Sequence, residues 1–147
     1  MLKFVFKLVM LKFVLKLLGD KASKREVSIS PPNDGKKQIC VIDDDGFVRD
    51  CVAKCLKQHT VVGLRLLPLE VAELYDYDIL IVDGNGIGNE KWKNGVEFLM
   101  EYTPKNPLQK LIHFSGYITE QDKRKLTKKG IKVITKGSCF YEDLILK

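Results

Sequence analysis

Five short apolar runs recur along the chain from Gln38 onward, and longer amphipathic segments separate them. The runs are rich in β-branched residues and bounded by Gly or Pro, which favours strands. Alternating strands and helices need crossover connections, so they predict a parallel sheet covered by helices on both faces. The predicted strands are residues 39–42, 61–67, 79–82, 111–114 and 131–135. The predicted helices are residues 47–58, 69–75, 95–102, 119–129 and 139–146.

Polar side chains follow four of these predicted strands, at the point where each strand ends. All strands of a parallel sheet end at one edge, and ligands bind there near the point where the strand order reverses. A lone Asp after a strand is most often a turn residue or a helix cap. The ordered set is more specific and predicts one shared site, made of Asp43, Asp44 and Asp45, then Asp83, Ser115 and Lys136.

These motifs resemble the receiver domain of two-component response regulators over about residues 38–147. VIDDDGFVR resembles the first-strand signature, with Asp43 and Asp44 as the acidic pair, and ILIVD resembles the third-strand signature, which ends in Asp83. LIHFSG and VITKG resemble the fourth and fifth strands, with Ser115 and Lys136 at the switch and lysine positions. The resemblance implies an α/β, doubly wound, flavodoxin-like fold whose five parallel strands lie in the order 2-1-3-4-5.

The resemblance also implies phosphoryl transfer. Asp83 would be a carboxylate nucleophile that takes a phosphoryl group from a sensor histidine kinase or a histidine phosphotransfer protein. Lys136 and Ser115 would contact the phosphoryl oxygens, and their movement would signal to an unknown downstream protein. Such a phosphoacceptor catalyses its own phosphorylation and slow dephosphorylation, so it is not a conventional enzyme.

A magnesium ion belongs to the same implied chemistry. Mg²⁺ prefers oxygen ligands and keeps several of its waters. By resemblance, Asp44, Asp83 and the backbone carbonyl of Asn85 would bind Mg²⁺ directly, and Asp43 would bind it through water.

Three positions depart from the family pattern or need a second interpretation. The family glycine that follows the phosphoacceptor stands closer to it than here, where Gly95 comes twelve residues after Asp83. This longer loop holds Trp92 and is expected to cover or reshape the site. Val133 replaces the family's switch aromatic, so we expect no aromatic rotamer switch there. His113 lies in a strand run and is predicted to be a core or edge residue, not a phosphohistidine.

Residues 1–37 form a distinct N-terminal segment, and residues 38–147 form the receiver-like domain. Residues 1–18 repeat a nine-residue pattern of apolar residues and lysines, which predicts a hydrophobic, basic helix. The alternatives for this helix are a membrane-surface helix, a partner-binding or self-associating helix, a true span, or translation that starts at Met10. Residues 21–37 are rich in Ser, Pro, Gly and charge and are predicted to be a flexible linker.

Charge and cysteine content narrow the function classes. Residues 1–37 carry nine basic and three acidic side chains, whereas residues 38–147 carry sixteen of each, so the net charge of +6 belongs to the N-terminal segment. A folded part with no net charge gives no reason to expect nucleic-acid binding. The four cysteines show no metal-ligand spacing and are predicted to be free thiols in a reducing cytosol. We therefore expect a cytoplasmic protein, with membrane association through residues 1–18 left open.

Three functions remain distinguishable from the sequence. The first is a single-domain receiver that is phosphorylated on Asp83. The second is a receiver-like interaction module that is never phosphorylated, docked at a membrane or in a complex by its N-terminus. The third is a flavodoxin-like or phosphatase-like enzyme, which the sequence disfavours because DDDGF stands where a phosphate-binding glycine loop would follow the first strand.

Overall fold

The computed structural model describes residues 35–137. The N-terminal helix, most of the predicted linker, the last predicted helix and Cys139 lie outside these residues. Among residues 35–137, no helix is both long enough and apolar enough to cross a membrane.

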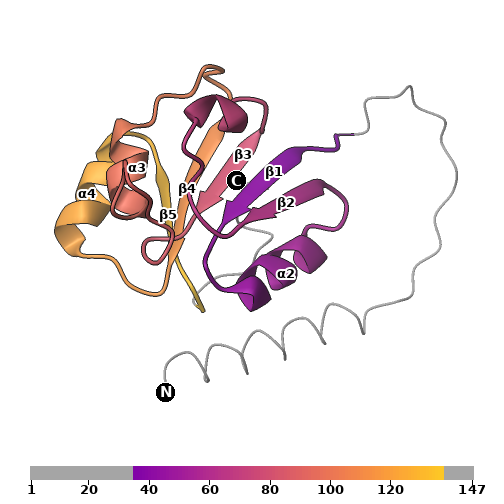
Figure 1. Cartoon of the computed structure of the whole chain (residues 1–147), viewed down its shortest axis with the longest axis horizontal. Helices are drawn as coiled ribbons and strands as arrows, with labels where there is room; N and C mark the ends of the chain where they lie inside the picture. The colour runs from indigo at the N-terminus through magenta and orange to yellow at the C-terminus, as the bar shows by residue number, and fades with distance from the viewer. Residues whose placement is uncertain (1–34, 138–147) are drawn as a thin grey trace, which may run out of the picture.

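A five-stranded parallel sheet forms the centre of the molecule, and its strand order is β2-β1-β3-β4-β5, as predicted (Figure 1). Ile42 pairs with Val82, Val82 with His113, and Ser115 with Thr135, so the strands end at a common edge. The polar residues that follow these strands therefore lie next to one another along this edge of the sheet. The strands are β1 (Gln38–Ile42), β2 (Thr60–Leu64), β3 (Ile79–Val82), β4 (Lys110–Ser115) and β5 (Lys132–Thr135).

Helices cover both faces of the sheet, with α2 on one face and α3 and α4 on the other (Figure 1). Each of these helices begins after a side chain that caps a free backbone N–H, namely Asp45, Asn94 and Thr119. The helices are α2 (Gly46–Cys55), α3 (Gly95–Glu101) and α4 (Glu120–Lys128), together with the 3₁₀ helix η1 (Val71–Leu74).

Two apolar clusters fill the space between the sheet and the helices, because successive side chains of a strand point to opposite faces. In β4, Ile112 and Phe114 join the cluster under α2, whereas Leu111 joins the cluster under α3 and α4. His113 and Ser115 follow Leu111 at alternate positions, so they face α3 and α4. The central strand β3 is buried along its whole length, as expected for a strand covered on both faces.

Three predicted elements differ from the structure. The predicted helix 47–58 ends at Cys55, because Leu56 is no longer helical and His59 closes a turn on it. The predicted helix 69–75 is only the short η1, which follows Pro68 and has no side-chain cap at its start. The predicted strand 61–67 ends at Leu64, since its partner β1 ends at Ile42 and gives it nothing further to pair with.

Candidate functional site

Three carboxylates meet where β1 and β3 end. Asp43 and Asp44 follow β1 and Asp83 follows β3, and one ligand atom from each lies within 4.8 Å of the others. Asp43 and Asp83 are buried, at 1% and 6% exposure, whereas Asp44 is exposed. Three carboxylate oxygens at this spacing suit a hard divalent cation such as Mg²⁺. The structure thus brings together the three side chains that the sequence predicted as metal ligands.

A lysine from the end of β5 completes the cluster. The Nζ of Lys136 lies 2.7 Å from Oδ2 of Asp43 and 3.1 Å from Oδ1 of Asp83. The backbone N–H of Lys136 donates to the carbonyl of Ser115 at 2.9 Å, which continues the pairing of β5 with β4 up to this residue. The ammonium group therefore bridges two buried carboxylates that come from different strands.

Burial and mutual repulsion control the protonation of these groups. Burial raises the pKa of Asp83 to about 6, the Asp43 carboxylate adds to this effect, and Lys136 opposes it. Burial also raises the pKa of Asp43, and the hydrogen bond and positive charge of Lys136 oppose this rise. Burial by itself would lower the pKa of Lys136, but the two carboxylates outweigh it and the pKa is raised. One lysine therefore does not neutralise the site, and a divalent cation would relieve the remaining repulsion.

Backbone groups hold the two buried carboxylates in place. The N–H of Gly84 donates to Oδ1 of Asp83 at 2.7 Å, and the N–H of Asp45 donates to Oδ1 of Asp43 at 2.9 Å. Arg49 on α2 donates to the carbonyl of Asp43. Asp45 also caps α2, so it supports the site without contributing a ligand atom to the carboxylate cluster.

The loop after Asp83 packs closely against this cluster. A Cβ on Gly84 would lie 2.8 Å from Oγ of Ser115, and a Cβ on Gly86 would lie 2.5 Å from Oδ2 of Asp44. Gly86 also has a φ of 79°, which favours glycine. Ser115 is buried and borders the loop that begins at Gly84, whereas Asn85 between the two glycines is exposed. Neither glycine was predicted to belong to the site, although GNG after a buried strand is a signal for a tight loop.

Trp92 does not cover the site. Its indole is buried against Phe98, with ring centroids 5.1 Å apart, and its Nε1 donates to Glu101 at 2.8 Å. The long loop is tied elsewhere by Asn89, whose Nδ2 donates to the carbonyls of Leu67 and Pro68. The longer loop was expected to cover or reshape the site; its first residues pack against the carboxylates, whereas Trp92 buries its apolar surface beside α3.

His113 is a buried residue of β4, as predicted, at 1% exposure. Neither ring nitrogen has a hydrogen-bond partner within the described part of the chain. Burial lowers the pKa of His113 to about 4, the positive charge of Lys136 lowers it further, and Asp122 opposes both effects. The imidazole is therefore neutral at pH 7. Its unpaired nitrogens distinguish it from an ordinary core residue.

Solved structures with similar folds are response-regulator receiver domains. A CheY-like receiver domain protein from Methanospirillum hungatei matches with a TM-score of 0.61 and 18% identity, covering 76% of this chain and 89% of that one. A response regulator from Burkholderia pseudomallei, solved with a phosphorylated aspartic acid and a calcium ion, matches with a TM-score of 0.59 and 16% identity. The match covers 75% of this chain and 65% of that one. NtrX from Brucella abortus matches with a TM-score of 0.60 and 22% identity. The match covers 76% of this chain and 26% of NtrX.

No protein-family model and no curated protein matches the sequence. The likeness therefore rests on the arrangement of the strands and helices, and on this basis the chain has the fold of a CheY-like receiver domain.

Proposed function

We propose that this chain is a response-regulator receiver that accepts a phosphoryl group on Asp83 with the help of Mg²⁺. The observation that carries the proposal is the meeting of Asp43, Asp44 and Asp83, whose ligand atoms lie within 4.8 Å of one another. The ammonium group of Lys136, at the end of a third strand, pairs with Asp43 and Asp83. Its receiver fold supports the same function.

Asp83 is the nucleophile in this proposal. Its Oδ1 accepts hydrogen bonds from Gly84 and Lys136, so we assign the attack to Oδ2. A bond forms between Oδ2 and phosphorus while the bond from phosphorus to the donor's leaving group breaks, and the leaving group keeps the electron pair. The raised pKa of about 6 leaves Asp83 mainly ionised at pH 7 and more basic than an ordinary carboxylate.

The neighbouring groups bind and position the reactants. Mg²⁺ would be held by Asp44, Asp83 and the backbone carbonyl of Asn85, with Asp43 bound through water, and it supplies positive charge to the transferring phosphoryl oxygens. Lys136 can exchange its contact with Asp83 for a contact with a phosphoryl oxygen, since the two groups carry like charge. The hydroxyl of Ser115, which borders Gly84, would hydrogen-bond a second oxygen.

The donor would be a sensor histidine kinase or a histidine phosphotransfer protein, and the response would pass to a downstream protein through a change in the Ser115 segment. Docking of residues 1–18 to a membrane surface and a cytoplasmic location remain parts of the same proposal.

Incubation of the full chain with acetyl phosphate and Mg²⁺, followed by intact mass measurement, tests the proposal. We expect a gain of one phosphoryl group in the wild type and no gain in Asp83→Asn. Asp45→Asn is the matched control, because Asp45 caps α2 and is not a proposed ligand, and it should gain the group as the wild type does. A wild type that stays unmodified would favour the alternative, a receiver-like interaction module that is never phosphorylated.

A further inference from the structure

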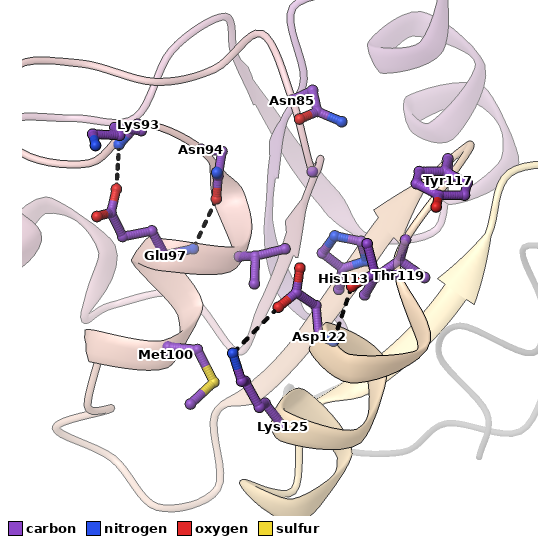
Figure 2. Close-up of a pocket in the computed structure, with 13 residues that line it drawn as sticks. Asn85, Lys93, Asn94, Glu97, Met100, His113, Tyr117, Thr119, Asp122 and Lys125 are labelled. Atoms are coloured by element: carbon purple, nitrogen blue, oxygen red, sulfur yellow. Dashed lines mark hydrogen bonds and ion pairs between the residues drawn. The ribbon is translucent and has the colours of Figure 1, made fainter.

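A hollow of about 380 Å³ lies between α3 and α4, next to the carboxylate site, and none of the three carboxylates lines it. Figure 2 shows Glu97 and Met100 of α3 on one side and Asp122 and Lys125 of α4 on the other, with His113 of β4 on the Asp122 side. The volume falls within the range of small-molecule sites in proteins. Gly84 and Asn85 border the hollow, so an occupant would contact the loop that follows the phosphoacceptor.

His113 gives this hollow a hydrogen-bonding anchor. Its side chain is 1% exposed, and both nitrogens lack a partner among the described residues, although burial of an unpaired polar group is unfavourable. Because the ring is neutral at pH 7, it offers one N–H donor and one nitrogen acceptor. The two nitrogens point in different directions, so a molecule in the hollow would pair with one of them, as a donor or an acceptor according to the tautomer.

The charges that line the hollow cancel. Asp122 pairs with Lys125 at 3.6 Å, and the carboxylate of Glu97 accepts a hydrogen bond from the backbone N–H of Lys93 at 2.6 Å. Two lysines and two acids thus line a space whose buried anchor carries no charge. A charged ligand would lose its hydration without gaining a net opposite charge, so these residues favour an uncharged one.

Apolar side chains complete the lining. Val96 and Met100 of α3 and Ile118 from the segment before α4 border the hollow. Such surfaces accommodate a flat ring, while the few polar groups fix its orientation.

We propose that the hollow between α3 and α4 binds a small, uncharged, planar molecule that carries both a hydrogen-bond donor and an acceptor, so that it can pair with one nitrogen of His113 in either tautomer. A heteroaromatic carboxamide and a nucleobase share this chemistry. The proposal concerns binding to the unphosphorylated protein and does not depend on the phosphorylation of Asp83.

Titration of the ¹⁵N-labelled full chain by NMR, with nicotinamide and with uracil as probes, tests this site. We expect saturable shifts at Gly84, His113 and Ile118 with at least one probe. Nicotinate, which has the ring of nicotinamide but a charged carboxylate, should bind about tenfold more weakly than nicotinamide or not at all. Binding of nicotinamide alone assigns a carboxamide, and binding of uracil alone assigns a nucleobase-type ligand.

Two variants connect the binding to the hollow. His113→Phe keeps an aromatic ring but removes both nitrogens, and it should weaken binding about tenfold or more. His59→Phe is the matched control. His59 is the only other histidine of the chain and lies just before β2, away from α3 and α4, so this variant should bind the probes as the wild type does. Val96→Phe fills the hollow without removing a polar group and should abolish binding, which keeps the test decisive if His113→Phe does not fold.

The proposal is overturned if neither probe gives saturable shifts, or if nicotinate binds as tightly as nicotinamide. Wild-type affinity in folded His113→Phe would also overturn it, as would wild-type affinity in Val96→Phe.

Discussion

Gly95 lies directly against the backbone of Asp83. A Cβ on Gly95 would overlap the carbonyl oxygen of Asp83, and the N–H of Gly95 donates to the carbonyl of the next residue, Gly84, at 3.0 Å. The start of α3 is therefore fixed to the carboxylate site in spite of the long intervening loop. Between these two points, Asn89 ties the loop to Leu67, and Trp92 ties it to Glu101 of α3.

We expect Gly95→Ala to lower the free energy of unfolding by about 3 kcal/mol, because the added methyl group must displace the Asp83 backbone. Gly116→Ala is the matched control, since a Cβ there meets nothing within 4 Å. Its effect should stay within about 0.5 kcal/mol. Urea denaturation of both variants measures the difference, and equal stabilities would show that α3 is not packed against Asp83.

Mg²⁺ should stabilise the folded chain, because it binds a carboxylate cluster that only the folded chain assembles. At a concentration a hundred times its Kd, the gain in the free energy of unfolding is about 3 kcal/mol. Asp44→Asn should lose most of this gain. Asp50→Asn, which changes another exposed acid nearby on α2, should keep it. Thermal melting with and without Mg²⁺ measures the effect, and a loss of equal size in both variants would contradict a specific site.

Lys136→Ala should destabilise the protein in Mg²⁺-free buffer by about 3 kcal/mol, because it leaves Asp43 and Asp83 buried without their shared counter-charge. Added Mg²⁺ should recover part of this loss, since a cation then replaces the missing ammonium. Chemical denaturation in EDTA and in Mg²⁺ gives both values. If Lys136→Ala were as stable as the wild type in EDTA, the ion pairs would contribute nothing measurable.

Acid should destabilise the fold through His113. Its pKa is lowered from 6.5 to about 4, so between these values the unfolded chain binds more protons than the folded one. The contribution of neutral His113 to the free energy of unfolding is complete above pH 6.5. It is lost as the pH falls toward 4, by about 3 kcal/mol in total. His113→Phe should lack this loss, which urea denaturation from pH 4 to 7 would detect. The raised pKa of Asp83 has the opposite effect on stability but is common to both proteins, so it cancels in the comparison. Parallel curves for the two proteins would contradict a buried neutral imidazole.

The strand pattern predicted the sheet well because short β-branched runs between Gly and Pro have few alternatives as buried elements. The order of polar residues at the strand ends likewise predicted which side chains would meet, since parallel strands all end at one edge. Residues such as Asp43 and Lys136 are thus placed by topology.

Contacts that depend on loop geometry were not predictable in the same way. Trp92 and Glu101 lie nine residues apart, and nothing local indicates that the indole turns toward α3 instead of the carboxylates. The missing hydrogen-bond partners of His113 depend on which side chains pack around it from other elements, which the sequence of β4 does not indicate. The weak start of η1 after Pro68 shortened a helix that apolar spacing alone had favoured.

The most direct test of the account is to locate the phosphoryl group by chemical trapping. Borohydride reduces an aspartyl phosphate to homoserine, which peptide mass mapping can place in the sequence. After treatment with acetyl phosphate and Mg²⁺, we predict homoserine at position 83 and at no other position, and none when Mg²⁺ is replaced by EDTA. Homoserine at position 43 or 44, or no homoserine with Mg²⁺ present, would contradict the assignment of Asp83 as the phosphoacceptor.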